Sequence, residues 1–157
     1  MLAKSNQKCT VLIADDSEED SFFIEKALRQ SVIFEVVGSV RDGEEAIAYL
    51  SGQEQYADRQ LWPFPELLLM DLKMPRLNGF EVLEWLRKQS FSGLKVVVLS
   101  GSSMAEDIQK VQSLGAVAFY TKSAQHAKLV ELVRSLEGFL LNSGPNSEVP
   151  IPPFRKS

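Results

Sequence analysis

Short runs of apolar residues recur along the chain, each bounded by polar or small residues. Five of them carry few charged side chains, and they cover residues 10–14, 33–40, 67–70, 94–99 and 116–121. Runs of this length and composition are typical of strands that are buried on both faces of a parallel sheet. The pattern therefore predicts five buried strands.

Segments of helical period separate these runs. In each segment the apolar residues recur three or four positions apart, which places them on one face of a helix. Segment by segment, they are Phe23, Ile24, Ala27 and Leu28; Ala46, Ile47 and Leu50; Phe80, Val82, Leu83 and Leu86; Met104, Ile108, Val111 and Leu114; and Leu129, Leu132, Val133, Leu136 and Leu140. Ser17, with the capping-box spacing to Asp20, and Asn78 are expected as helix N-caps. Gly52 is expected to end the second helix, and the last helix is expected over 125–141.

Strands and helices thus alternate five times, which predicts an α/β fold. Right-handed connections between the strands give a five-stranded parallel sheet with helices on both faces. We expect this domain to cover residues 9–141, with an N-terminal extension at 1–8 and a flexible tail with four prolines at 142–157. In such sheets, ligands bind outside the carboxyl ends of the strands.

One connection, residues 53–65, is longer than the usual loop of this fold. It carries Tyr56, Trp62 and Phe64. Two interpretations are open: these aromatic side chains fold back onto the sheet, or they form a surface for a partner protein.

Composition narrows the class of protein. The chain has 157 residues, of which 45% are hydrophobic, and its formal net charge is −4 with a pI near 5.1. These values exclude wholesale disorder and argue against broad binding of nucleic acid. Cys9 is the only cysteine, so no intramolecular disulfide can form, and we interpret it as a packing residue in a reducing compartment. The sequence shows neither a signal peptide nor a stretch long enough to span a membrane, so a soluble cytoplasmic protein is expected.

Polar side chains stand at the carboxyl ends of four predicted strands. Asp15 and Asp16 follow the first, Asp71 the third, Ser100 the fourth and Lys122 the fifth. Three carboxylates in one crevice repel one another unless a cation lies between them, and carboxylate oxygens suit Mg²⁺. A lysine and a hydroxyl would complete a site for a phosphoryl group, and an aspartate there can act as the nucleophile toward a phosphoryl donor.

Each of these residues also has a purely structural interpretation. Asp16 could cap a helix, the acids at 15–20 could form a solvated face, and Ser100 could be a turn residue. The joint pattern, with one group at each of four strand ends, favours a site.

These motifs resemble the receiver domain of two-component response regulators, the fold of the chemotaxis response regulator. The resemblance covers residues 9–141. It rests on Asp15-Asp16, on Asp71-Leu-Lys-Met-Pro75 followed by Gly79, on Ser100-Gly101 and on Lys122. It implies the flavodoxin-like strand order 2-1-3-4-5.

The resemblance also implies a metal site and a phosphoacceptor. Asp71 would accept the phosphoryl group. Asp16 and Asp71 would bind Mg²⁺ directly, the backbone carbonyl of Lys73 would be a third ligand, and Asp15 would act through water.

Three further residues receive roles from the resemblance. Ser100 would donate a hydrogen bond to the phosphoryl group, and Lys122 would pair with it. Phe119 stands at the family's aromatic switch position, where the ring turns inward on phosphorylation and changes the surface of the fourth helix, fifth strand and last helix. The alternative for Phe119 is an ordinary core aromatic.

Two positions depart from the common family pattern or add to it. The residue after the lysine is Ser123 instead of proline, and a cis peptide before a non-proline residue is costly, so whether the bond between Lys122 and Ser123 is cis or trans stays open. That serine and the long loop are similar to stand-alone receivers that pair with phytochrome-type sensor kinases. Lys73 follows the acceptor by two residues, and its ammonium is expected to slow hydrolysis of the aspartyl phosphate unless it points to solvent.

We therefore expect a single-domain response regulator. It would take a phosphoryl group from the phosphohistidine of a sensor kinase or phosphotransfer protein and then bind another protein; nucleic acid and membranes are not expected partners. Its chemistry would be limited to self-phosphorylation and autodephosphorylation of Asp71. The end of the last helix, with Phe139, Leu140 and Leu141, could extend a homodimer face or simply finish the core.

Three alternatives remain at this stage. The first is a pseudo-receiver that binds a partner without productive phosphorylation, which only Ser123 favours. The second is an aspartate-nucleophile phosphatase, although Lys73 stands where such enzymes usually carry a general acid. The third is a flavin protein of the same sheet order, which the crowded strand-end acids oppose because a flavin phosphate is anionic.

Overall fold

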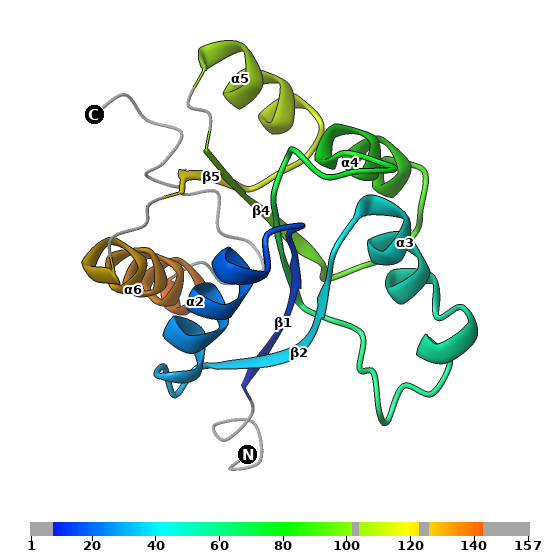
Figure 1. Ribbon diagram of the computed structural model, residues 1–157, viewed down its shortest axis with the longest axis horizontal. Helices are drawn as coiled ribbons and strands as arrows, with labels where there is room; N and C mark the ends of the chain where they lie inside the picture. The colour runs from blue at the N-terminus through cyan, green and yellow to red at the C-terminus, as the bar shows by residue number, and fades with distance from the viewer. Residues whose placement is uncertain (1–7, 102–103, 123–125, 143–157) are drawn as a thin grey trace.

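A computed structural model of the protein describes residues 8–101, 104–122 and 126–142 (Figure 1). Its five strands are all parallel and follow the order β2-β1-β3-β4-β5, which confirms the predicted fold. The strands are β1 Cys9–Ala14, β2 Phe34–Val40, β3 Leu67–Met70, β4 Lys95–Ser100 and β5 Ala118–Thr121. The helices are α2 Glu18–Arg29, α3 Gly43–Ser51, α4 Gly79–Arg87, α5 Ala105–Ser113 and α6 His126–Asn142, with a short 3₁₀ helix η1 at Glu54–Tyr56.

Helices cover both faces of the sheet and enclose two hydrophobic cores. Helices α2 and α6 lie on one face, and α3, α4 and α5 lie on the other (Figure 1). The side chains of β1 alternate between the two cores: Val11 and Ile13 face α2 and α6, whereas Leu12 and Ala14 face the other layer. Both faces of the strand are buried, which explains why its sequence is a continuous apolar run.

The predicted helix caps are present. Ser17 Oγ accepts a hydrogen bond from the backbone N–H of Asp20 at 3.1 Å. Asn78 and Glu81 form a complete capping box, with both hydrogen bonds at 2.9 Å. Gly52 ends α3 in the left-handed conformation with φ +67°, a conformation that favours glycine.

Two apolar side chains that the helical pattern assigned to buried faces are exposed. Phe23 is 41% exposed because α2 turns Ile24, Ala27 and Leu28 toward the core and leaves Phe23 at the edge of that stripe. Met104 precedes the first residue of α5 and is 58% exposed. The predicted helical face at these two positions was therefore wrong.

The loop at 53–65 folds back onto the protein through an aromatic cluster, which we define as Tyr49, Tyr56, Arg59, Trp62 and Phe64. The ring centroids of Tyr49 and Tyr56 lie 4.9 Å apart, and those of Tyr56 and Trp62 lie 5.3 Å apart. The Arg59 guanidinium donates hydrogen bonds to the carbonyls of Leu50 at 3.0 Å and Trp62 at 3.1 Å. Of the two interpretations of these aromatics, the structure therefore supports packing.

Cys9 is half-buried at the start of β1. Burial, together with the nearby negative charge of Glu66, raises the pKa of its thiol to about 12. The group therefore stays a neutral thiol at physiological pH, in agreement with a packing role.

Parts of the predicted organisation lie outside the described residues. These are almost all of the expected extension at 1–8 and tail at 142–157, together with Ser123 and the side chains of Leu140 and Leu141. Among the helices that the structure describes, none combines the length and the apolar character needed to cross a bilayer.

Candidate functional site

Backbone hydrogen bonds continue past the strand ends and bring the predicted site residues to one edge of the sheet. The N–H of Asp15 donates to the carbonyl of Val40 at 3.0 Å, and the N–H of Asp71 donates to the carbonyl of Ala14 at 2.9 Å. The N–H of Lys122 donates to the carbonyl of Ser100 at 2.7 Å. Because the strands are parallel, their carboxyl ends meet at this carboxyl edge of the sheet.

The turn after Asp71 needs a glycine at its far end. Gly79 donates its N–H to the carbonyl of Leu72 at 2.9 Å, so α4 begins directly against the turn. A Cβ at this position would lie 2.7 Å from the carbonyl oxygen of Asp71 and 2.9 Å from Cα of Leu72. Glycine allows this close approach, and the capping box of Asn78 then starts the helix.

Lys122 reaches into a group of carboxylates at this edge. Its Nζ lies 2.7 Å from Oδ2 of Asp15, 2.9 Å from Oδ2 of Asp20 and 3.0 Å from Oδ2 of Asp71. Burial alone lowers the pKa of the Lys122 ammonium, but its hydrogen bonds with the three carboxylates raise that pKa above the usual range. Lys122 therefore carries a full positive charge at neutral pH.

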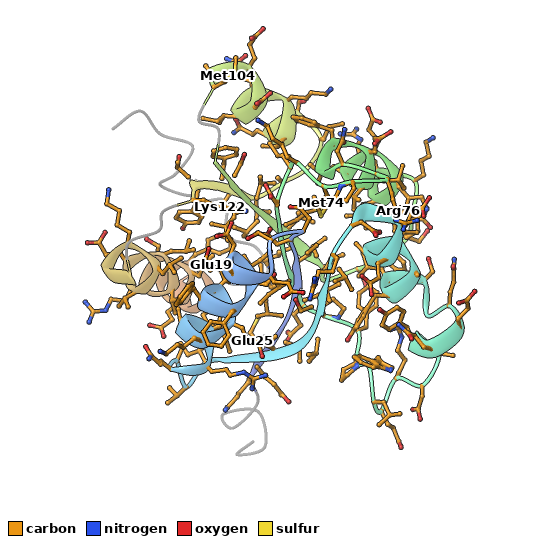
Figure 2. All side chains as sticks on the ribbon, viewed as in Figure 1. Glu19, Glu25, Met74, Arg76, Met104 and Lys122 are labelled. Atoms are coloured by element: carbon orange, nitrogen blue, oxygen red, sulfur yellow. The ribbon has the colours of Figure 1, made fainter. Side chains whose placement is uncertain are left out.

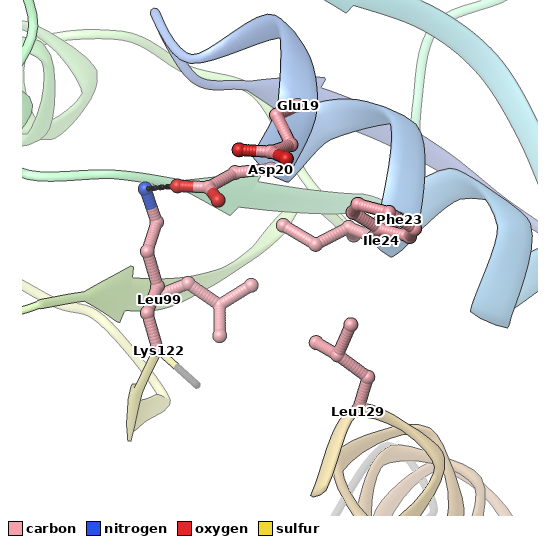
Figure 3. Close-up of a pocket in the computed structure, with 7 residues that line it drawn as sticks. All are labelled: Glu19, Asp20, Phe23, Ile24, Leu99, Lys122 and Leu129. Carbon is pink, nitrogen blue, oxygen red and sulfur yellow. Dashed lines mark hydrogen bonds and ion pairs between the residues drawn. The ribbon is translucent and has the colours of Figure 1, made fainter. Parts of the chain in front are cut away.

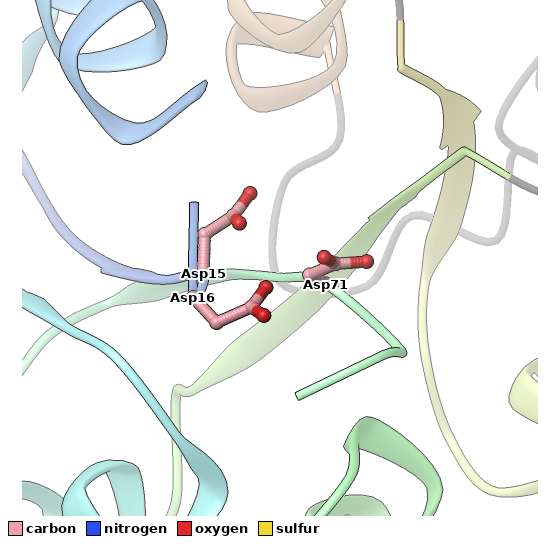
Figure 4. A group of neighbouring side chains, drawn as sticks. All are labelled: Asp15, Asp16 and Asp71. Carbon is pink, nitrogen blue, oxygen red and sulfur yellow. The ribbon is translucent and has the colours of Figure 1, made fainter. Parts of the chain in front are cut away.

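Three carboxylates form a candidate metal centre beside the lysine. Asp15, Asp16 and Asp71 each offer an oxygen, and these oxygens lie within 4.8 Å of one another (Figure 4). Asp15 and Asp71 are buried, whereas Asp16 is exposed. This donor set fits Mg²⁺, which takes carboxylate oxygens and keeps several waters.

Backbone groups hold two of these carboxylates in place. Oδ1 of Asp15 accepts a hydrogen bond from the N–H of Ser17 at 2.9 Å, and Oδ1 of Asp71 lies 3.4 Å from the N–H of Lys73. Burial raises the pKa of the Asp15 carboxyl above its usual value, while the hydrogen bonds from Lys122 and Ser17 oppose that shift. A divalent cation would relieve this unfavourable burial of charge.

An open hollow of about 490 Å³ lies next to the metal centre. Its walls include Asp16, the exposed Lys73, the buried Ser100 and Phe80. Lys73 borders this opening and is exposed, so both interpretations of its side chain, contact with a phosphoryl group and orientation to solvent, stay open.

Phe119 is only 2% exposed and belongs to the core between the sheet and the layer of α3, α4 and α5. It shares that core with Val98 and Val111. The ring thus points inward. This position is compatible with both interpretations of Phe119, the switch aromatic and the ordinary core residue.

Asp20 is the site residue that sequence reasoning missed. The acids after the first strand were open to interpretation as a solvated face, yet Asp20 contacts Lys122 across 102 positions of the sequence. The one available signal was position: Asp20 lies in the expected first turn of the helix that directly follows the strand-end acids.

The fold and this edge together define a class of protein. A doubly wound sheet with two acids after the first strand, an acid after the third and a lysine after the fifth is the arrangement of a receiver domain. Residues 11–134 match the family described as the response regulator receiver domain, so the chain belongs to that family. The predicted family is thereby confirmed.

Particular relatives are also similar over most of the chain. The response regulator Rcp1 of Synechocystis sp. is 31% identical over 144 residues, which cover 91% of this chain and 96% of Rcp1. The crystal structure of the phosphorylated cyanobacterial phytochrome response regulator RcpA has a TM-score of 0.77 at 35% identity and covers 88% of this chain and 97% of RcpA. The Mn²⁺-bound form of Rcp1 has a TM-score of 0.74 at 31% identity and covers 92% of this chain and 99% of Rcp1.

Proposed function

We propose that the chain is a response regulator that accepts a phosphoryl group on Asp71 from the phosphohistidine of a sensor kinase or phosphotransfer protein. The observation that carries this proposal is the position of the Lys122 ammonium, 3.0 Å from Oδ2 of Asp71 at the carboxyl edge. A buried carboxylate that faces a lysine and lies next to two further acids is arranged to receive an anionic group together with a cation.

In the transfer, a carboxylate oxygen of Asp71 attacks the phosphorus, an O–P bond forms, and the N–P bond to the donor histidine breaks. The imidazole leaves with the electron pair of that bond. Lys122 stabilises the charge on the phosphoryl oxygens, and the Ser100 hydroxyl donates a hydrogen bond to one of them. Asp16, Asp71 and the Lys73 carbonyl would hold Mg²⁺, with Asp15 acting through water, and the bound ion would supply positive charge that offsets the charge of the phosphoryl group.

The response would pass from the site to a protein-binding surface. Ser100 and Phe119 lie on neighbouring strands, and Phe119 packs in the core that also contains Val111 of α5. A shift of Ser100 toward a phosphoryl group would bias the inward position of Phe119 and alter the surface of α5, β5 and α6. A downstream protein, or a second copy of the chain, would bind that surface.

The relatives suggest the signalling context. RcpA is described as a cyanobacterial phytochrome response regulator, and another similar structure, RPA3017 of R. palustris, is described as acting in red light signalling. This chain has 35% identity to each of them. We therefore assign it a phytochrome-type sensor kinase as partner, a cytoplasmic location, and a receiver at 9–141 flanked by the extension and the tail.

Incubation of the full chain with acetyl phosphate and Mg²⁺, followed by intact mass measurement, tests the proposal. The wild type should gain one phosphoryl mass, and Asp71→Ala should gain none. If the wild type gains none where an established receiver does, the chain is a binding module of the pseudo-receiver type. Turnover of a phosphate ester would instead indicate a phosphatase.

Lys73 should prolong the phosphorylated state. Its side chain lines the hollow next to Asp16 and Ser100, where water would reach the aspartyl phosphate. An ammonium that pairs with phosphoryl oxygens there should slow hydrolysis by a few-fold, about 1 kcal/mol. The decay of phosphorylated Lys73→Asn, followed by intact mass, should be faster than that of the wild type; equal or slower decay would contradict this role.

A further inference from the structure

Three carboxylates surround the Lys122 ammonium in the resting protein. An ammonium carries three N–H donors, and three carboxylates, those of Asp15, Asp20 and Asp71, lie within 3.0 Å of Nζ. During transfer, Lys122 must also donate to an oxygen of the arriving phosphoryl group. One of the three carboxylates therefore has to give way.

Exposure decides which carboxylate leaves at the lowest cost. The side chain of Asp15 is 2% exposed, that of Asp71 is 8% exposed, and that of Asp20 is 43% exposed. A buried carboxylate that loses its cation stays desolvated and is strongly disfavoured. Asp20 can exchange the ammonium for water, because it lines a hollow of about 390 Å³ between α2 and α6 (Figure 3).

We propose, on the basis of the function proposed above, that Asp20 is a positioning residue that occupies one Lys122 donor at rest and releases it to the phosphoryl oxygen. Only hydrogen bonds change in this exchange: the contact from Nζ to Oδ2 of Asp20 breaks, and a contact from Nζ to the phosphoryl oxygen forms. Asp20 therefore competes with the phosphoryl group for Lys122. Removing its charge should strengthen the binding of that group.

Helix α2 offers a variant of Asp20 and a matched control. The backbone N–H of Asp20 donates to Ser17 Oγ, so Asp20→Asn keeps the helix cap and changes only the side-chain charge. Glu19 precedes Asp20 and lines the same hollow, but within the described part of the chain it makes no ion pair (Figure 3). Glu19→Gln therefore removes the same charge without touching Lys122.

The first test is calorimetric titration of the Mg²⁺-loaded full chain with beryllium trifluoride, a phosphoryl analogue. Asp20→Asn should bind the analogue about three- to fivefold more tightly than the wild type. A gain of this size is what the loss of one competing, half-exposed ion pair should give. The affinity of Glu19→Gln for the analogue should stay within about twofold of the wild type. Glu19 has no ion-pair partner among the residues that the structure describes, and salt screens the long-range effect of its charge. If Asp20→Asn binds no more tightly than Glu19→Gln, the inference is overturned.

The second test needs neither metal nor analogue. A double-mutant cycle compares urea midpoints of the wild type, Asp20→Asn, Lys122→Met and the double variant. Asp20→Asn should lower the midpoint when Lys122 is present and raise it in the Lys122→Met background, where only repulsion from Asp15 and Asp71 remains. Equal shifts in both backgrounds would overturn the inference even if Asp71 accepts phosphate. A wild type that binds no analogue would overturn the proposed function itself.

Discussion

The aromatic cluster and the carboxyl edge both contain buried polar groups, but only in the aromatic cluster are these groups matched by partners. In the aromatic cluster the two tyrosine hydroxyls and the arginine have hydrogen-bond partners of their own. The Tyr49 hydroxyl donates to the carbonyl of Pro63 at 2.8 Å, and the Tyr56 hydroxyl donates to Oε2 of Glu45 at 2.8 Å. The Arg59 guanidinium lies 5.7 Å from the centroid of the Tyr49 ring and donates to two carbonyls.

The carboxyl edge has an excess of negative charge instead. The Lys122 ammonium, labelled in Figure 2, contacts the carboxylates of Asp15, Asp20 and Asp71. Asp16 adds a fourth carboxylate close to Asp15 and Asp71. Such an excess destabilises the fold, because like charges at close range disfavour one another. Balanced polar groups thus hold a loop in place, whereas an unbalanced set of carboxylates prepares a site for a cation.

The largest expected effect is that of Lys122→Met on stability. This change leaves Asp15 and Asp71 buried without a cation and should lower the free energy of unfolding by about 3 kcal/mol. Mg²⁺ should recover part of the loss, because the ion supplies the missing charge. Urea unfolding with and without Mg²⁺ measures both effects, and unchanged stability without Mg²⁺ would contradict the proposed imbalance.

Arg59→Met should destabilise the protein without affecting the metal. It removes the hydrogen bonds to the carbonyls of Leu50 and Trp62, at a cost of about 2 kcal/mol. Mg²⁺ affinity should stay unchanged, because the loop precedes β3 and therefore lies at the opposite edge of the sheet. Arg29→Met, which loses only an exposed ion pair with Glu25, is the matched control for urea unfolding. If the two variants lower the free energy of unfolding equally, the proposed structural role of the aromatic cluster is contradicted.

Tyr49 should make the aromatic cluster sensitive to alkaline pH. Burial raises the pKa of its hydroxyl from 10.0 to about 12. Above pH 10 the unfolded chain loses this proton while the folded chain retains it, so stability falls between pH 10 and 12. Tyr49→Phe should cost about 1 kcal/mol at neutral pH and should show a smaller alkaline loss in urea unfolding. An alkaline loss as large as in the wild type would show that Tyr49 does not titrate as described.

Asp16→Asn should have the smallest effect on stability, and in the opposite direction. Asp16 is exposed and forms no ion pair among the residues described, so its charge mainly repels Asp15 and Asp71. Its removal should raise stability without Mg²⁺ by up to about 1 kcal/mol and should abolish most of the Mg²⁺ binding seen by calorimetry. Glu19→Gln is the control, and it should leave Mg²⁺ binding intact. A loss of stability on Asp16→Asn would argue against repulsion at this edge.

Much of this arrangement could be predicted from the sequence because it depends on the backbone. Strands buried on both faces show as continuous apolar runs, and the carboxyl ends of parallel strands meet at one edge. Those two facts place Asp15, Asp71, Ser100 and Lys122 together without knowledge of any side-chain contact. Gly79 could also be identified from the sequence as part of the motif. Only the structure explains why a glycine is required there, since it shows the close approach to the Asp71 carbonyl.

The remaining features depend on how side chains from distant segments meet. The contact between Asp20 and Lys122 joins α2 to the end of β5, and no local pattern encodes it. The position of the long loop was likewise open, because the packing of Trp62 depends on Tyr49 of α3, which lies outside the loop. Exposure of Phe23 depends on the width of the buried stripe of α2, which periodicity alone does not determine.

Asp71 is the residue that we propose takes the phosphoryl group at this unbalanced edge. The decisive measurement treats the chain with acetyl phosphate and Mg²⁺, reduces the product with borohydride, and locates the modified residue by peptide mass spectrometry. Borohydride converts an acyl phosphate of aspartate to the alcohol, so we expect homoserine at position 71 and at no other aspartate. Reduction at Asp15, Asp16 or Asp20 instead, or no reduction at all, would contradict it.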